Sequence, residues 1–175
     1  MLTTYDGLLE RIVFTLENMF YNLICATNLF RMSGADVSKT EHNITYTDNR
    51  DGTYTISTSG STNASTECTL GPSITFKQHH VYYIGGAPDS ASYETYFLYF
   101  HTGSGLQDTG GGVVIDRGSY GTYSYVPKIK VAYNVTIPTP VVFRPQVYDL
   151  TECFGAGHEP KTVAEFLAYA HEGEI

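Results

Sequence analysis

The spacing of apolar positions divides this chain of 175 residues into three parts. In the first part apolar residues recur with the period of an α-helix, and in the second they alternate between turn residues, as in β-strands. In the third part a glycine-containing turn precedes a short helical pattern. The pattern predicts a helix for oligomerisation or attachment over residues 1–31, a β-domain over residues 32–150, and a turn with a short helix over residues 151–175.

The predicted N-terminal helix carries a narrow seam of large apolar residues. They occupy the a and d positions of about two and a half heptads: Leu9, Ile12, Leu16, Met19 and Leu23. Because no second long helix is predicted to pair with this one, we expect the five residues to form the axis of a homo-oligomer. The mixture of Leu, Ile and Met favours three chains over two. Packing of the same face on its own β-domain is the alternative.

The middle of the chain has the features of short antiparallel strands. Ile44 and Tyr46 alternate with polar residues before the Asp-Gly turn at residues 51–52, and Tyr54 and Ile56 do so after it. Glycine tolerates the positive φ that hairpin turns need, so this stretch predicts a β-hairpin. Further strands are predicted at residues 73–77, 80–84, 94–101, 112–116, 121–126, 128–136 and 141–148.

Roughly nine short strands without intervening helices predict a mainly β fold. We expect an antiparallel, jelly-roll-like sandwich with an N-terminal amphipathic helix and a short C-terminal helix. An immunoglobulin-like sandwich is the alternative, although the chain has no Trp and lacks the cysteine spacing of true immunoglobulin domains.

The C-terminal part contains signals for a turn and a capped helix. Gly155 and Gly157 suit a tight turn, and Thr162 with Glu165 forms the pattern of a capping box. Apolar residues then lie on one face of the predicted helix. We expect four side chains to pack against the β-domain or a neighbouring subunit: Phe154, Val163, Phe166 and Leu167.

Charge and cysteine content exclude some classes of function. The net charge of −8 argues against binding to a nucleic-acid backbone, which requires clustered Lys and Arg. The apolar stretch at residues 13–26 is short and interrupted by polar residues, so no membrane span is expected. Cys25, Cys68 and Cys153 are far apart and form no CxxC pair, so we expect buried free thiols in a reducing cytosol.

No cofactor is expected from the potential ligand residues. Candidate ligands for a transition metal are His79, His80, His101, His158, Cys68 and Cys153, but none has the spacing of a known motif. A structural Ca²⁺ would need oxygen ligands, for which the candidates are Asp48, Asp51, Asp108 and Asp116. These acids do not form a spaced acidic loop, so no motif supports a calcium site.

The candidate catalytic residues do not form a recognisable catalytic motif either, so we expect that the protein is not an enzyme. Cys153 and His158 lie in one turn without a third group to orient the histidine. Glu94, Asp108 and Asp116 could be proposed as glycosidase carboxylates, but nothing in the sequence selects an opposed pair.

The segment FRPQVYDLTECFGAGHEPKTVAEF, residues 143–166, resembles a C-terminal segment of structural proteins of tailed bacteriophages. The residues that fit are Pro145, Asp149, Leu150, Thr151, Phe154, Gly155, Gly157, Glu159, Pro160, Thr162, Val163 and Phe166. Upstream, residues 27–34, 50–62 and 82–100 are similar to β-sandwich domains of phage tail and fibre proteins, which resemble carbohydrate-binding modules.

The resemblance covers most of residues 28–166 and implies a virion protein of the fibre, baseplate or capsid-decoration type. Such a protein is assembled in the bacterial host cytoplasm and contacts other virion proteins. The resemblance supplies no catalytic residue. The threefold symmetry common among phage fibres also favours a trimer.

Tyrosine-rich strands raise a second hypothesis, a host-glycan adhesin. The stretches SYETYFLYF, residues 92–100, and SYGTYSYV, residues 119–126, each place aromatic residues on both sides of a strand. One side must face the core, and the other could bind a host-surface polysaccharide, since Tyr is large, rigid and amphipathic. The candidate contacts are Tyr93, Tyr96, Tyr120 and Tyr123. The alternative is that these tyrosines only build the sandwich.

Overall fold

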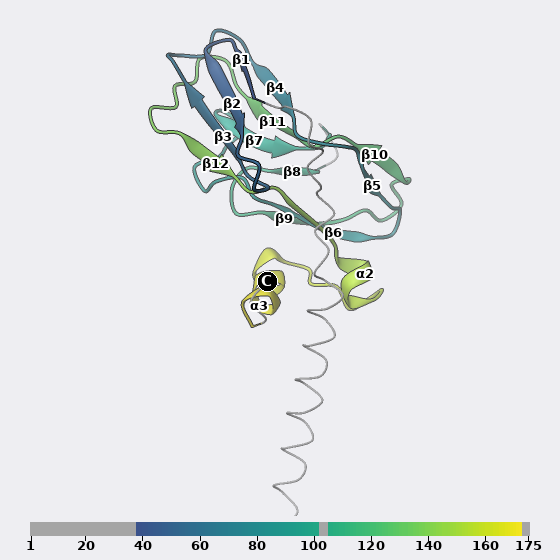
Figure 1. Ribbon diagram of the computed structural model, residues 1–175. Coiled ribbons are helices and arrows are strands. Elements are labelled where there is room, and N and C mark those ends of the chain that lie inside the picture. The colour runs from purple at the N-terminus through teal and green to yellow at the C-terminus, as the bar shows by residue number, and fades with distance from the viewer. Residues whose placement is uncertain (1–37, 102–104, 173–175) are drawn as a thin grey trace, which may run out of the picture.

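A computed structural model describes residues 38–101 and 105–172. This part of the chain is mainly β, with several antiparallel sheets and two short helices (Figure 1). The mainly β class predicted from the sequence is therefore confirmed. The five residues of the predicted coiled-coil seam lie outside the described residues, so the oligomer stays a prediction.

The first sheet contains four strands in the order β1-β2-β3-β12. Their bounds are Lys39–Glu41 for β1, Ile44–Asp48 for β2, Tyr54–Thr58 for β3 and Val141–Phe143 for β12. β2 and β3 form the hairpin predicted around residues 51–52, with Tyr46 opposite Ile56. Gly52 adopts φ 88°, and the Asp51 carboxylate accepts hydrogen bonds from the amide and hydroxyl of Thr53. The turn is thus held by the residues that predicted it.

A second four-stranded sheet has the order β4-β11-β7-β8. Its strands are Thr66–Thr69 for β4, Lys128–Val131 for β11, Tyr96–Tyr99 for β7 and Gln107–Asp108 for β8. Side chains of both four-stranded sheets meet in one apolar cluster, to which Ile44, Ile56, Leu98 and Ile129 belong. The main core therefore lies between sheets that are distant in the sequence.

The remaining strands form a three-stranded sheet, β13-β6-β9, and a ribbon of β10 and β5. Their bounds are Gln146–Asp149 for β13, Val81–Gly85 for β6, Val113–Asp116 for β9, Tyr123–Tyr125 for β10 and Ile74–Phe76 for β5. Successive side chains of β6 point to opposite faces, as in any strand. Tyr82 and Ile84 join the main core, whereas Tyr83 joins a second cluster on the outer face.

One predicted strand, residues 141–148, is divided in two. β12 belongs to the first sheet and β13 to the three-stranded sheet, with Arg144 and Pro145 between them. Because proline has no amide hydrogen, Pro145 interrupts the hydrogen bonding between strands at this point. Between β12 and β13 the backbone runs directly against Gly86, where a Cβ would overlap the carbonyl oxygen of Arg144. Three short strands, β1, β4 and β8, had not been predicted, because their residues are largely polar.

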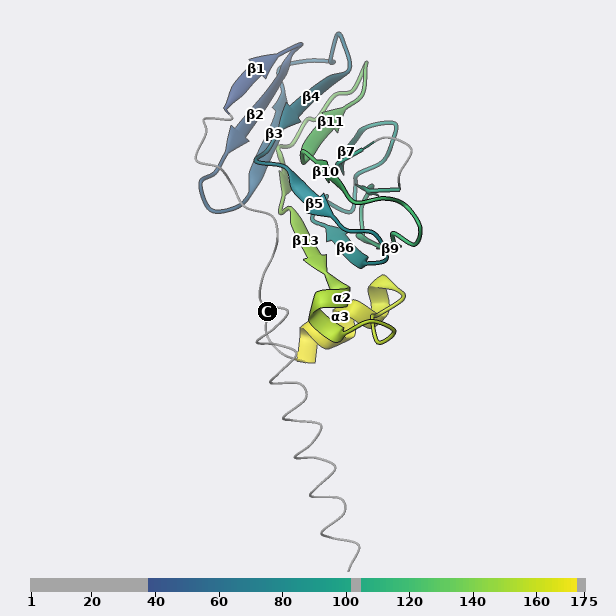
Figure 2. The same cartoon turned by 90° about the vertical axis from the view of Figure 1, so that its right-hand side faces the viewer.

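The C-terminal segment covers the outer face of the three-stranded sheet. α2 (Leu150–Phe154) follows β13 directly, and α3 (Val163–Glu172) lies beside it (Figure 2). Phe154 and Phe166 are buried in the second cluster with Tyr83 and Tyr148, and Val163 packs against it. The predicted packing is confirmed for these three residues of the segment. Leu167 is 37% exposed and is not part of this cluster, because the next residue of a helix is turned about 100° from Phe166. Its packing against a neighbouring subunit stays a prediction.

The capping box of α3 and the turn before it have the features predicted from the sequence. The Thr162 hydroxyl accepts from the Glu165 amide, and the Glu165 carboxylate accepts from the Thr162 amide, so the capping box is confirmed. Gly155 and Gly157 adopt φ 84° and 85°. A Cβ at either position would meet nothing within 4 Å, so the requirement for glycine is the positive φ and not a steric clash.

Phe166 is expected to stabilise the attachment of the C-terminal segment. Its ring lies 4.4 Å from that of Tyr83 and 5.5 Å from that of Tyr148, measured between centroids. Truncating a buried Phe to Ala removes these contacts and leaves a cavity, so Phe166→Ala should lower the free energy of unfolding by about 3 kcal/mol. Chemical denaturation measures this. Leu167→Ala is the matched control, and an equal loss in both variants would contradict the packing described.

Candidate functional site

The four tyrosines predicted to bind glycan do not form one surface. Tyr93 and Tyr120 are each 63% exposed and Tyr123 is 55% exposed, whereas Tyr96 is buried. Tyr96 packs edge-on against Phe143, and its hydroxyl bonds the hydroxyl of Ser90 at 2.7 Å. The prediction that Tyr96 contacts a ligand is therefore wrong. Along β7, alternation turns Tyr96 and Leu98 toward the main core, a choice that the sequence left open.

An aromatic row follows the strand β10. The ring centroids of Tyr123 and Tyr125 are 6.1 Å apart, and those of Tyr125 and His101 are 4.8 Å apart. Tyr123 and His101 are exposed and Tyr125 is half-buried. His101 was not predicted as part of this surface, because it follows a different strand, and only the fold brings it beside Tyr125.

Tyr93 and Tyr120 lie apart from this row. Tyr93 packs edge-on against Phe97, with ring centroids 5.2 Å apart. Tyr120 lies in the loop between β9 and β10, where its ring faces the guanidinium of Arg117. Among the described residues, no ring contact joins Tyr93 to Tyr120 or Tyr123. The exposed aromatic surface is therefore centred on β10 and the loop before it.

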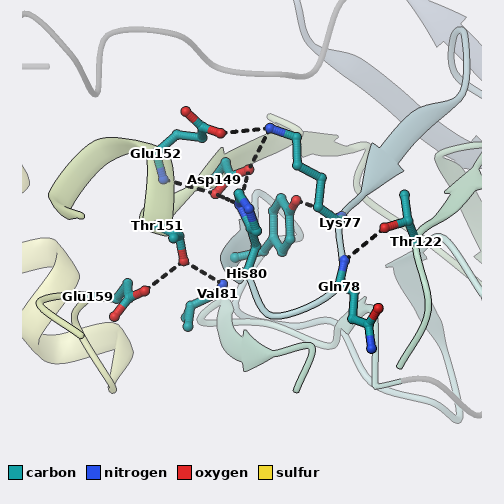
Figure 3. A network of polar contacts seen from close by, with 10 residues as sticks. Lys77, Gln78, His80, Val81, Thr122, Asp149, Thr151, Glu152 and Glu159 are labelled. Atoms are coloured by element: carbon teal, nitrogen blue, oxygen red, sulfur yellow. Dashed lines mark hydrogen bonds and ion pairs between the residues drawn. The ribbon is translucent and has the colours of Figure 1, made fainter. Parts of the chain in front are cut away.

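A second candidate is a network of polar side chains between β6 and the C-terminal segment (Figure 3). Asp149 is buried and caps α2, because its carboxylate accepts a hydrogen bond from the Glu152 amide at 3.1 Å. Nδ1 of His80 lies 3.0 Å from each oxygen of the same carboxylate. Nζ of Lys77 lies 3.9 Å from it. The buried charge of Asp149 thus has polar partners from three directions.

An exposed ion pair completes one side of this network. Nζ of Lys77 donates to the Glu152 carboxylate at 2.7 Å. The hydrogen bond with Glu152 raises the pKa of Lys77, and the hydrogen bond from Lys77 lowers the pKa of Glu152. Both side chains are largely exposed, so solvent weakens the contribution of this pair to stability.

Thr151 fastens the other side of the network. Its hydroxyl accepts a hydrogen bond from the Val81 amide at 2.9 Å and donates one to Glu159 at 2.7 Å. The other carboxylate oxygen of Glu159 accepts from the Gly157 amide at 2.8 Å. Burial raises the pKa of Glu159, but the hydrogen bonds from Thr151 and Gly157 outweigh it, so the pKa lies below its usual range. The charged carboxylate therefore holds the turn against β6.

His80, Asp149 and Glu152 offer ligand atoms that all lie within 4.8 Å of one another. This trio could not be predicted from the sequence, because His80 is distant in the chain from Asp149 and Glu152 and no motif spacing links them. The ammonium of Lys77 lies beside both carboxylates and supplies the positive charge that a metal ion would bring. The arrangement is therefore already an ion-pair network, in which Lys77 partly offsets the charge of the two acids.

A cleft of about 470 Å³ lies beside this network. It is lined by Val81, Val114, Asp116, Glu159, Pro160 and Lys161. Of the acids considered as glycosidase carboxylates, only Asp116 lines it, and this side chain accepts from the Gly118 amide. Asp108 is buried and accepts from the amides of Ala87, Gly110 and Gly112, so its role is to hold a loop.

The cysteines differ from the prediction of free thiols. Cys68 is a buried free thiol, and burial raises its pKa to about 11, which makes it unreactive at neutral pH. Cys153 is disulfide-bonded, so the expectation of a free thiol is wrong there. Its partner is not among the described residues. Which cysteines meet is decided by the fold, and their separation along the chain does not reveal it.

Comparisons with known proteins gave no match, whether to a family model, a curated protein or a solved structure. Within residues 38–101 and 105–172, no helix has the length and apolar character required to cross a membrane.

Replacing Glu159 by Gln should destabilise the fold in a pH-dependent way. At pH 7 we expect a loss of about 1 kcal/mol, because two hydrogen bonds to a charged, partly exposed carboxylate become bonds to a neutral amide. The folded-state pKa is lowered, so the stabilisation is complete above the ordinary value of 4.5 and is lost as the pH falls through the folded-state pKa. The difference between the two proteins should therefore shrink in acid.

Thermal unfolding from pH 7 to pH 3 measures this difference. Glu94→Gln is the control, since Glu94 is exposed and has no hydrogen-bond partner in the described part of the chain. A constant difference between wild type and Glu159→Gln across the range would show that the charge of Glu159 is not what holds the turn.

Proposed function

We propose that the chain is a non-enzymatic structural protein of a tailed-bacteriophage particle, in a fibre, baseplate or capsid decoration. The observation that supports the proposal is that the motif residues of the C-terminal segment form structural hydrogen bonds. Of its polar residues that fit the phage segment, Asp149, Thr151 and Glu159 form the hydrogen bonds that attach the segment to the β-domain. Thr162 caps α3 through Glu165. A motif whose residues stabilise the fold is what we expect of a structural protein of a virion.

We further propose that the β-domain is of the jelly-roll type and is displayed on an oligomer. Two four-stranded antiparallel sheets share one core, and strands that are neighbours in a sheet, such as β3 and β12, are distant in the sequence. Such long connections are typical of double-sheet β-domains. Residues 1–31 would form the oligomerisation helix, with three chains around its axis.

Host-glycan recognition is a second candidate, favoured by the aromatic row on β10. Tyr123, Tyr125 and His101 offer adjacent ring faces near the surface, and Tyr120 lies in the loop that leads into β10. Amphipathic rings of this kind can stack on the apolar faces of sugars while their hydroxyls bond sugar oxygens. The two candidates are compatible, since an adhesin can also be a structural part of a virion.

Purified particles of the phage that encodes the chain should contain it. Mass spectrometry of the particles, followed by electron microscopy with an antibody against the β-domain, would locate it on the tail, baseplate or capsid. A chain that is synthesised during infection but is absent from purified particles would contradict the proposal.

The full-length chain should be a trimer in solution. Light scattering after size-exclusion chromatography measures its mass. Leu16→Asp places a charge in the predicted axis and should give monomers, because a charge cannot be buried among apolar a and d residues without a partner. Asn18→Asp adds the same charge beside the seam and serves as the control. A monomeric wild type would mean that the helix packs on its own β-domain.

Glycan binding should be weak for one copy and measurable for a multivalent array. On a glycan array probed with the chain displayed in many copies, Tyr123→Ala should lower retention about tenfold, by loss of one stacked ring of about 1–3 kcal/mol. Tyr133→Ala, a change at another exposed tyrosine, is the control. Equal retention of Tyr123→Ala and wild type, or no binding to any host polysaccharide, would remove this second candidate.

A further inference from the structure

Arg117 is a buried cation that has no counter-ion among the residues that the structure describes. Only 1% of the residue is exposed, and Nε has no hydrogen-bond partner. Its amide donates to the carbonyl of His80 at 2.9 Å, so Arg117 continues the line of β9. Alternation along the strand places its side chain on the same side as Val113 and Ile115, which pack against the main core. Within residues 38–101 and 105–172, no carboxylate forms an ion pair with it.

Such an arrangement is unfavourable unless something offsets it. A guanidinium cannot lose its proton at physiological pH, so burial cannot neutralise it. Buried charges in proteins are normally paired or fully hydrogen-bonded, because removing them from water is costly. The adjacent acid, Asp116, is exposed and accepts from the Gly118 amide. The folded chain therefore holds a positive charge that an external anion could satisfy.

Tyr120 covers this charge. The guanidinium carbon lies 5.2 Å from the centre of the Tyr120 ring, a cation–π contact, and the other face of Tyr120 is open to solvent. The covering loop has glycines at positions 118 and 121, and Gly118 adopts φ 44°. A cation–π contact is weaker than a charge-assisted hydrogen bond to a carboxylate or phosphate. An anion of that kind could thus displace the ring and pair with Arg117.

We propose that Arg117 anchors a binding site for a negatively charged sugar residue, with Tyr120 as its movable cover. The planar fork of a guanidinium matches the two oxygens of a carboxylate or a phosphate. Tyr123, three residues after Tyr120, supplies an exposed ring on which the sugar can stack. This inference rests on the glycan-binding candidate and adds the class of sugar, either a uronic acid or a phosphate-substituted sugar. No sequence signal points to this site, since a lone Arg between Asp and Gly is typical of a turn.

Titration calorimetry on the full-length chain tests the proposal with matched pairs of probes. A galacturonate oligosaccharide is compared with its uncharged methyl ester, and glucose 6-phosphate with glucose. We expect at least one acidic probe to bind about tenfold or more tightly than its neutral match. Whether galacturonate or glucose 6-phosphate shows the larger ratio distinguishes a carboxylate from a phosphate as the natural group.

Variants separate binding from folding. Arg117→Met should remove the preference for the acidic probe, and its melting temperature should be equal to or higher than that of wild type, because an unpaired buried charge has been replaced by an apolar side chain. Arg117→Lys keeps the charge but loses the fork, and should reduce the preference. Tyr120→Ala uncovers the guanidinium and should bind inorganic phosphate more tightly than wild type does.

Three results would overturn the proposal. Equal binding of acidic and neutral probes would refute the role of Arg117 while leaving glycan recognition intact. A melting temperature of Arg117→Met well below that of wild type would assign Arg117 to the support of the fold. If neither wild type nor Tyr120→Ala bound the acidic probes or inorganic phosphate, this inference would be wrong, whereas the multivalent glycan array decides the glycan-binding candidate separately.

Discussion

Strand β6 must be covered on both faces, and the rest of the C-terminal structure depends on this constraint. Tyr82 and Ile84 face the main core, whereas Val81 and Tyr83 face the other way. An apolar outer face left in water would be a patch of the kind that soluble domains avoid. The segment after β13 turns back over that face, and Phe166 fills the space above Tyr83. The hydrophobic effect thus accounts for the presence of the segment but not for its exact position.

Hydrogen bonds to a few acids fix that position. Asp149 ends β13 and begins α2, so one carboxylate ties the strand, the helix and His80 together. Thr151 joins the amide of Val81 to Glu159, which in turn holds the turn at Gly157. Because these polar groups are directional, they define one register for a segment whose apolar contacts alone would allow several. The motif residues are therefore committed to structure.

The residues proposed for ligand recognition are not the motif residues of the C-terminal segment. The loop between β9 and β10 and the strand β10 are largely exposed and rich in tyrosine, and hydrogen bonds from Gln78 to Ser119 and Thr122 hold the loop. The same loop covers Arg117, a charge that no described acid neutralises. This loop and the polar network of the C-terminal segment begin at the same end of the three-stranded sheet, where Asp149 lies opposite Tyr82 and the Arg117 amide donates to the carbonyl of His80.

The sequence was sufficient to predict the features that depend only on interactions between neighbouring residues. The hairpin at residues 51–52, the capping box of Thr162 and Glu165, and the positive φ of Gly155 each depend on residues within a few positions of one another. The mainly β class follows in the same way from alternation and turn residues. None of these features needs knowledge of a distant partner.

Features that depend on distant contacts were decided only by the tertiary structure. Alternation showed that one side of β7 must be buried but not which, and the packing of Tyr96 against Phe143 resolved it. The pairing of His80 with Asp149, and the burial of Arg117 behind Tyr120, arise where separate strands and loops converge. The disulfide at Cys153 belongs to the same class. The sequence alone determines which segments can form strands and turns, whereas the choice of partner depends on the packing of all of them at once.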